Sequence, residues 1–195
     1  DYQIPMMSLP GVFETNFETM PNKVPYISIP EDRVTTRPAS SALHIGLVWK
    51  GSANHQRNAW RSPGLEVFQP LTKISDIKLF SLQKDDEVID LQDAGLESEI
   101  VALGNTFEDF FDTAAAILNL DLVITPDTAV AHLAGALAKP VWLILPFSSE
   151  WRWFEEREDS PWYPTARLFR QREKGNWPEV VQHLKTALAD FVKTT

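Results

Sequence analysis

The sequence predicts a fold of the α/β class, with one parallel β-sheet flanked by helices. Two short apolar runs, residues 122–124 and 141–145, lack polar alternation, which is typical of strands buried on both faces of a parallel sheet. Such runs alternate along the chain with segments of helical character, and this alternation favours a parallel sheet with right-handed crossovers. The 195 residues suffice for one sizeable domain of this kind.

Residues 1–42 differ from the rest of the chain because they are rich in proline and weakly periodic. Each proline fixes φ and removes a backbone donor, so no long helix or strand is expected before residue 43. The prolines of this region are Pro5, Pro10, Pro21, Pro25, Pro30 and Pro38. We predict that residues 1–42 form an arm or linker from a missing N-terminal region, and that residues 43–195 form a single α/β domain.

The first expected strand covers residues 44–49 and is followed by a polar loop that ends at Arg61. Ser62 and Pro63 form a favourable helix start, because serine caps a helix and proline fits its first turn. The helix that follows would bury Leu65, Phe68 and Leu71. Pro70 lies within this pattern and is expected to kink or shorten the helix.

The middle of the chain is expected to hold two further strands and one helix. Residues 78–83 form the second strand and residues 100–103 a short third strand, joined by a polar, acidic connection. Asp112 is expected to cap a helix over residues 113–119.

Residues 120–137 combine an apolar strand, a tight polar turn and a helix rich in small residues. Asp127 and Thr128 lie in the turn, and their short oxygen-bearing side chains are typical of a helix start. The turn follows the carboxyl end of a strand, which is where open α/β sheets bind ligands. Because a helix N-terminus offers backbone N–H groups and a positive dipole end to an anion, this turn predicts a site for a phosphate-bearing ligand.

The C-terminal part is expected to complete the sheet. Residues 141–145 and 166–170 are predicted as the fifth and sixth strands, and the loop between them, residues 146–164, is crowded with aromatic side chains. These rings either present flat faces to sugars or bases, or pack in the core or at an interface. Asn176 is expected to cap a last helix with one apolar face. That face comprises Val180, Val181, Leu184, Leu188 and Phe191.

The composition argues against several classes of partner and site. A formal net charge of −9 disfavours nucleic-acid binding through phosphate neutralisation. The chain has no cysteine, which excludes disulfides and thiolate metal sites and fits a cytoplasmic location. No apolar run approaches the roughly 20 residues that span a bilayer, so no membrane span is expected. None of the histidines is paired with another at i, i+4, and we expect no metal site.

The loops after the first and fourth strands are expected to meet where the strand order of the sheet reverses. The residues brought near the Asp127 turn would be Lys50, Gly51, Ser52, Arg57 and Arg61. A glycine permits close backbone approach, and an arginine offers a two-pronged donor suited to phosphate. The alternative is that these cations are solvated loop charges.

Asp127 and His132 each admit two roles. Asp127 either caps the helix or accepts a hydrogen bond from a sugar hydroxyl. His132 lies four residues after Thr128 and so shares its helix face. It either contacts a ligand phosphate or holds the turn in shape.

Several segments of the sequence resemble the C-terminal half of bacterial GT-B glycosyltransferases. Residues 121–142 are similar to the family nine heptosyltransferases, whose motif places His-Leu shortly after Asp-Thr, as residues 127–133 do here. The chain is also similar to bacterial proteins in which tetratricopeptide repeats precede a glycosyltransferase-like module, and which look like distant relatives of the O-linked N-acetylglucosamine transferases. The matching segments lie at residues 46–49, 81–84, 151–153, 160–164 and 167–171.

The resemblance implies a Rossmann-like sheet of the GT-B type that binds a nucleotide-sugar as substrate, with no cofactor. The residues that would hold the diphosphate are Ser52, Arg61, Thr128 and Ala129. Those that would contact the donor sugar or the nucleoside are Asp127, Gln83 and Lys84. Supporting residues would be Lys50, Gly51, Arg57 and His132. Arg61, expected just before a helix, and Arg57 compete for the same phosphate contact.

One departure from the GT-B pattern concerns catalysis. The general base and the acceptor site of these enzymes usually belong to an N-terminal domain, whereas only the proline-rich residues 1–42 precede the α/β domain here. No residue is therefore nominated as the catalytic base, and the nucleotide, the sugar and the protein or glycan acceptor stay open. The expected function is the donor-binding domain of a metal-independent, inverting glycosyltransferase, within a larger cytoplasmic protein. The alternative is a non-catalytic binding or scaffold module, in which the arm and the aromatic loop serve a partner or a homo-oligomer.

Overall fold

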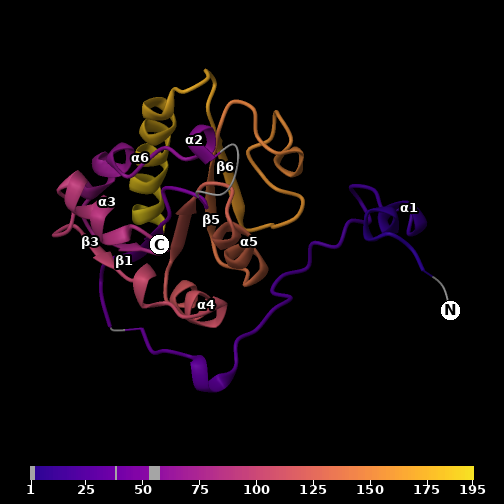
Figure 1. Ribbon diagram of the computed structural model, residues 1–195, viewed down its shortest axis with the longest axis horizontal. Helices are drawn as coiled ribbons and strands as arrows, with labels where there is room; N and C mark the ends of the chain where they lie inside the picture. The colour runs from indigo at the N-terminus through magenta and orange to yellow at the C-terminus, as the bar shows by residue number, and fades with distance from the viewer. Residues whose placement is uncertain (1–2, 38, 53–57) are drawn as a thin grey trace.

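The computed structural model describes residues 3–37, 39–52 and 58–195, and its centre is a six-stranded, parallel β-sheet (Figure 1). The strands are β1 (Leu43–Leu47), β2 (Ile77–Ser81), β3 (Ile100–Ala102), β4 (Leu122–Thr125), β5 (Val141–Leu145) and β6 (Ala166–Arg170). Their spatial order is β3-β2-β1-β4-β5-β6, so the order reverses between β1 and β4. This arrangement confirms the predicted α/β class with a single Rossmann-like sheet.

Helices and short helical turns connect the strands and flank the sheet. The α-helices are α1 (Leu9–Val12), α2 (Asn58–Arg61), α3 (Glu87–Ala94), α4 (Phe110–Leu118), α5 (Ala129–Ala136) and α6 (Trp177–Thr194). The 3-10 segments are η1 (Met6–Ser8), η2 (Glu31–Arg33), η3 (Glu66–Lys73), η4 (Gly104–Thr106) and η5 (Trp151–Trp153).

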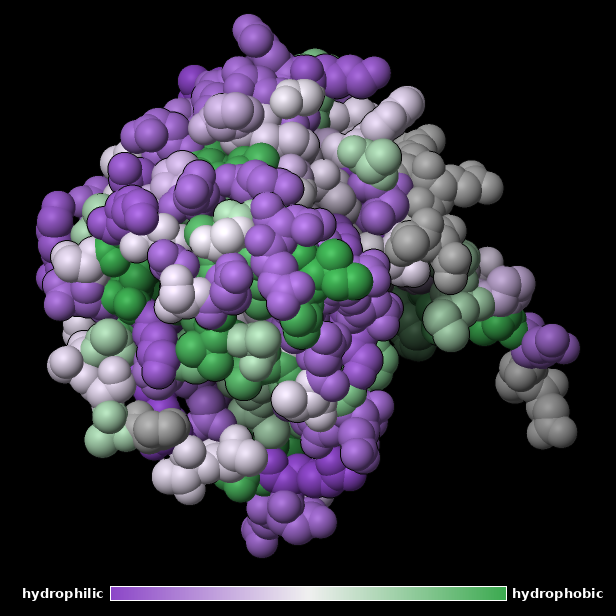
Figure 2. All heavy atoms as spheres, turned by 60° about the vertical axis from the view of Figure 1, so that its left-hand side comes forward, coloured by the Kyte–Doolittle hydropathy of each residue, from purple (hydrophilic) through white to green (hydrophobic). Residues whose placement is uncertain are grey.

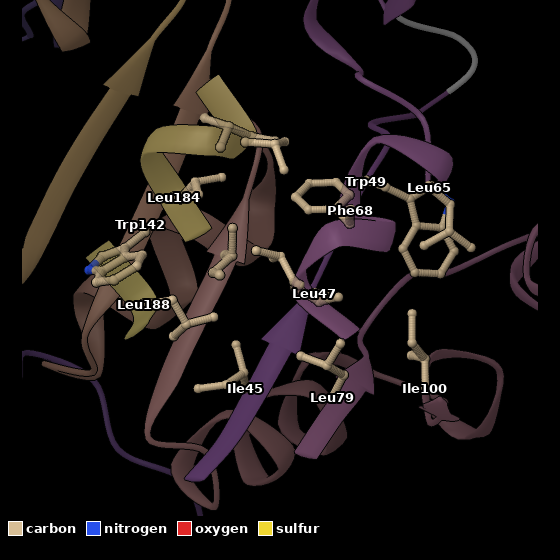
Figure 3. Close-up of a cluster of buried hydrophobic side chains, with 14 of the residues drawn as sticks. Ile45, Leu47, Trp49, Leu65, Phe68, Leu79, Ile100, Trp142, Leu184 and Leu188 are labelled. Carbon is tan, nitrogen blue, oxygen red and sulfur yellow. The ribbon is translucent and has the colours of Figure 1, made fainter. Parts of the chain in front are cut away.

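One face of the sheet is covered by α6 and η3. Neighbouring strands align in register, which places the row Ile100, Leu79, Ile45 and Leu122 side by side across the sheet. This row packs in a buried cluster with side chains of η3 and α6 (Figure 3). The partners from those two segments are Phe68, Leu71, Val180, Val181, Leu184 and Leu188. Full burial of each such side chain contributes about 1.5–3 kcal/mol, so this layer fixes the positions of the strand ends.

The opposite face carries α4 and α5. Apolar side chains of β4 and β5, Val123 and Leu143 among them, pack there against small residues of the two helices, such as Ala114 and Ala134. The small side chains allow α5 to lie close to the sheet, which brings the first turn of this helix to the edge where the strands end.

The arm runs along α4 and α5 before it enters β1. Arg33 forms an ion pair of 2.8 Å with Asp112, and Arg37 forms one of 2.6 Å with Asp121. The Tyr26 N–H donates to the Ala136 carbonyl over 3.1 Å, at the end of α5. The first part of the arm, including α1, stands out from the rounded body (Figures 1 and 2). The division at residue 42 into arm and domain stays a prediction.

The predicted helix start at Ser62 and Pro63 is wrong. The hydroxyl of Ser62 donates to Asn58 Oδ1 within the preceding turn α2, which sequence analysis had treated as loop. Helical structure resumes only at Glu66, because Gly64 takes a φ of +82° that an α-helix does not allow. The resumed segment η3 is a 3-10 helix that contains Pro70, in line with the expected distortion.

The connection between β2 and β3 contains a helix, α3, that the sequence reasoning missed. Its apolar signal is weak, because only Glu87 and Leu91 of this helix are buried. It ends at Gly95, which has a left-handed φ of +64°.

Two expected N-caps differ in outcome. The cap of α4 is Asp109 rather than Asp112, since Asp109 accepts hydrogen bonds from the N–H groups of Phe111 and Asp112. Asp112 was a reasonable choice of residue type, but its carboxylate is used by Arg33 of the arm. The cap of α6 is confirmed, because Asn176 accepts from the Glu179 N–H over 3.3 Å.

Candidate functional site

A cavity of about 530 Å³ opens where β1, β2 and β4 end, at the reversal of strand order. Its lining includes the following predicted site residues: Lys50, Gly51, Ser52, Arg61, Gln83, Lys84, Thr128 and Ala129. The prediction that the loops after β1 and β4 meet is confirmed, since the Val48 N–H donates to the Ile124 carbonyl and Arg61 reaches the turn before α5. Arg57 lies outside the described residues.

Arg61 links the two loops. It is the last residue of α2, rather than a residue just before a helix as predicted. Its Nη1 donates to the Asp127 carbonyl over 2.7 Å, while its buried Nε has no hydrogen-bond partner among the described residues. Gly51 permits this arrangement, because a Cβ at that position would lie 2.5 Å from Arg61 Nη2. The guanidinium is therefore held beside the N-terminus of α5.

Thr128 occupies the N-cap position of α5, but its side chain makes no capping hydrogen bond. Its hydroxyl lies 2.9 Å from that of Thr125, which itself donates to the Pro126 carbonyl. The cap position was predicted correctly and the capping bond was not. The first turn of α5, with Ala129 and Val130 in the cavity wall, is thus not capped by any side chain of the described residues.

Gln83 and Lys84 lie in the cavity wall with their polar groups engaged. Gln83 Oε1 accepts from the N–H groups of Trp49 and Lys50, at 3.2 and 3.1 Å, and its Nε2 donates to the Lys84 carbonyl. The ammonium of Lys84 donates to the Phe107 carbonyl. Both side chains thus tie neighbouring loops together and shape the cavity.

Lys50 and Ser52 both line the cavity. The Lys50 ammonium lies 2.7 Å from Asp90 and 3.4 Å from Asp86, so its charge is shared with two carboxylates of the α3 region. Ser52 is exposed at the mouth of the cavity. Beyond the predicted set, the lining includes Phe107 and Phe110, two aromatic residues that the sequence reasoning did not single out.

Asp127 and His132 do not line this cavity but lie beside it, against the aromatic loop. His132 Nε2 is 3.6 Å from Asp127 Oδ1, and His132 Nδ1 is 3.0 Å from the Tyr163 hydroxyl. The His132 ring stacks on that of Trp153 with centroids 5.5 Å apart. The sequence signal for these contacts was the density of aromatic residues in the loop, which could not reveal the partner of each ring.

The Asp127 carboxylate is stabilised in its ionised form. Burial on its own would raise its pKa, but His132, the indole N–H of Trp153 and the Arg61 guanidinium outweigh burial and hold the pKa below its ordinary value. The Trp153 N–H is buried and makes no hydrogen bond of normal geometry with any described residue. Asp127 can therefore act as an acceptor of hydrogen bonds.

The molecule is a Rossmann-like α/β domain with a candidate anion site. Its parallel sheet has a cavity where the strand order reverses, and a helix N-terminus lies in the cavity wall with an arginine beside it. Within the described part of the chain, every helix falls short of the length and apolar character needed to cross a membrane.

Comparison with known proteins gives likenesses of sequence and of fold. No family model matches the chain. It is 28% identical over 151 residues to protein FlbA of Caulobacter vibrioides, a match that covers 75% of this chain and 25% of that protein. It is similar in structure to ADP-heptose LPS heptosyltransferase II of E. coli, with a TM-score of 0.62 and 13% identity over 91% of this chain and 56% of that one. A second solved structure, the family 9 glycosyl transferase of Veillonella parvula, gives a TM-score of 0.58 and 16% identity over 81% of this chain and 48% of that one.

The two structural likenesses establish a glycosyltransferase-like fold. The chain spans about half the length of the two solved glycosyltransferases and a quarter of the length of FlbA. The relation to tetratricopeptide-repeat proteins and to O-linked N-acetylglucosamine transferases stays a prediction.

Proposed function

We propose that this chain is the nucleotide-sugar-binding domain of a metal-independent, inverting glycosyltransferase. The observation that carries the proposal is the N-terminus of α5, which no described side chain caps and which opens on the cavity while Arg61 is fixed beside it. Backbone N–H groups at a helix start and an arginine are together suited to a diphosphate. The glycosyltransferase-like fold of the solved neighbours supports the same assignment.

The cavity and the residues beside it offer separate places for the parts of a nucleotide-sugar. Phe107 and Phe110 of the lining would provide apolar contacts for a nucleoside, and the start of α5 would hold the diphosphate. The donor sugar would then lie beyond the turn, near Asp127, whose ionised carboxylate accepts hydrogen bonds from hydroxyl groups. Gln83 and Lys84 would shape the cavity, since each makes hydrogen bonds to backbone groups of neighbouring residues.

The chemical role of this half would be to stabilise the departing nucleoside diphosphate. Charge develops on the leaving phosphate as the glycosidic bond breaks, and the α5 N-terminus with Arg61 would hold that charge without a metal ion. We propose that the general base and the site for a protein or glycan acceptor belong to a further domain, within a larger cytoplasmic protein that carries tetratricopeptide repeats.

Calorimetric titration with UDP-, ADP- and GDP-sugars, in buffer with and without EDTA, tests the donor site. We expect one of them to bind with an affinity that EDTA leaves unchanged. Arg61→Ala should weaken that binding about tenfold or more, because a charged hydrogen-bond donor to phosphate is lost. Arg172→Ala removes the same charge from an exposed side chain outside the cavity, and should leave the affinity unaltered. If the two substitutions weaken the binding equally, Arg61 acts only through the overall charge of the protein and not through contact with the phosphate.

A second candidate function, a non-catalytic scaffold, is favoured by the apolar surface of the arm. The side chains of Met6, Met7 and Phe13 are 81%, 79% and 73% exposed, and exposed apolar groups of this kind mark interaction surfaces. Size-exclusion chromatography with light scattering, run beside the titration, separates the two functions. A stable oligomer that binds none of the nucleotide-sugars would favour the scaffold.

A further inference from the structure

A row of hydrogen-bonding groups leads from the arm to the turn before α5. The Tyr26 hydroxyl of the arm donates to the Tyr163 hydroxyl of the aromatic loop over 3.5 Å. The Tyr163 hydroxyl lies 3.0 Å from His132 Nδ1 on α5. On the other side of the same imidazole ring, Nε2 lies 3.6 Å from Asp127 Oδ1. Three separate segments of the chain are therefore linked in one row: the arm, the aromatic loop, and α5 with the turn before it.

Packing holds the rings of this row in place. His132 is stacked on Trp153 with an interplanar angle of 25°, and the Tyr163 ring meets it at 60°. The Tyr163 ring also presses on α5 at Gly135, where a Cβ atom would collide with it. The backbone bond from Tyr26 to the Ala136 carbonyl anchors the arm at the same helix. The imidazole thus has little freedom to rotate.

The neighbours of the imidazole also determine which nitrogen carries its proton. The Asp127 carboxylate, held in its ionised form, can only accept, so the hydrogen belongs on Nε2. Burial raises the pKa of the Tyr163 hydroxyl, which therefore keeps its proton and can donate it to Nδ1. A neutral His132 is consequently fixed with Nδ1 as acceptor and Nε2–H as donor.

We propose that Tyr163 and Tyr26 are positioning residues of the candidate donor site, which hold the Nε2–H of His132 toward Asp127 so that this carboxylate stays oriented to accept hydrogen bonds from the sugar of the bound nucleotide-sugar. This inference rests on the proposed function. It assigns the aromatic loop and the arm a part in donor binding, through contacts with His132 rather than through contacts with the donor.

The protonation of the imidazole is measurable without any ligand. Long-range ¹H–¹⁵N spectra of the histidine side chains should show His132 with a protonated Nε2 and a bare Nδ1. Tyr163→Phe keeps the ring that packs on Gly135 and removes only the hydroxyl, so it should shift the His132 Nδ1 signal and lower the Nε2–H population. The signals of His44 and His183, which lie on other elements, serve as internal controls.

Affinities for ADP-, UDP- and GDP-sugars provide the second readout, since the sugar is the part of the donor proposed to lie near Asp127. Tyr163→Phe should weaken the tightest of these complexes about three- to tenfold, as expected for a lost hydrogen bond. Tyr26→Phe should weaken it less, because its hydroxyl acts at one remove and over 3.5 Å. In a His132→Gln background, whose amide N–H replaces Nε2–H and needs no partner at Nδ1, adding Tyr163→Phe should cause no further loss.

The outcomes separate this inference from the function on which it rests. If Tyr163→Phe leaves the His132 signals unaltered, the proposed positioning of His132 by Tyr163 is overturned. The proposal is also overturned if Tyr163→Phe weakens binding by the same factor in the protein with His132 and in the His132→Gln variant. Failure of the ADP-, UDP- and GDP-sugars to bind the unaltered protein would reject the donor site itself. The imidazole signals would then still decide whether Tyr163 sets the state of His132.

Discussion

At the scale of single residues, the turn before α5 concentrates groups whose roles are set by their neighbours. Thr128 has the residue type of an N-cap, yet its hydroxyl is paired with Thr125, which leaves the helix start to the cavity. Gln83, which is predicted to contact the donor, has an Oε1 that accepts hydrogen bonds from two backbone N–H groups. Residue type thus indicates what a side chain can do, and only the fold decides which partner it meets.

The acid dependence of stability should reveal the partners of Asp127. Its pKa is lower in the folded protein than the ordinary value of 3.8. The stabilisation from its ionised form is therefore complete above about pH 5 and is lost as pH falls from about 4 through the folded-state pKa. Asp127→Asn should lower the free energy of unfolding at pH 7, and the difference from the unaltered protein should shrink below about pH 4.

Urea unfolding at pH 7, 5, 4 and 3 measures this difference. Asp93→Asn, at an exposed position of α3, is the matched control and should change stability little at any of these values. If the difference in the free energy of unfolding between the unaltered protein and Asp127→Asn stays constant down to pH 3, the lost stability does not come from the carboxylate charge.

At the scale of elements, the sequence predicted best those segments whose apolar pattern is strong. All six strands were expected close to their observed positions, because runs such as Val141–Leu145 carry a continuous apolar signal. The last helix was also found from its apolar face and its cap. Helix α3 was missed because its buried positions include a carboxylate, Glu87, which accepts hydrogen bonds from the N–H groups of Leu103, Gly104 and Asn105. A contact of this kind leaves no helical pattern of apolar residues in the sequence.

The N-cap of α6 gives a prediction at this scale. Asn176→Ala should lower the free energy of unfolding by about 0.5–2 kcal/mol, because an N–H group in the first turn of the helix loses its acceptor. Asn176→Asp keeps an acceptor oxygen of similar reach and should retain most of the stability. Thermal or urea unfolding of both proteins tests this, and a similar loss in the two variants would show that the amide acts through other contacts.

At the scale of the whole molecule, the strand order places the candidate site, and the arm is tied to the same face as α5. Sequence reasoning anticipated that the loops after β1 and β4 meet, since this follows from the order of a doubly wound sheet. It could not anticipate the approach of Tyr26 to α5, because that contact joins residues far apart in the chain that share no pattern. For the same reason the split of the site into a cavity and an adjoining Asp127–His132 pair emerged only from the structure.

The central claim is that the first turn of α5 holds the diphosphate of a nucleotide-sugar. Backbone amide NMR spectra, recorded while ADP, UDP or GDP is added, locate that contact directly. Our account predicts that the amide signals of Ala129 and Val130 shift and saturate with one of the three nucleotides, and that Arg61→Ala raises the concentration needed. Saturating shifts confined to other parts of the chain, or none with any of the three, would contradict it.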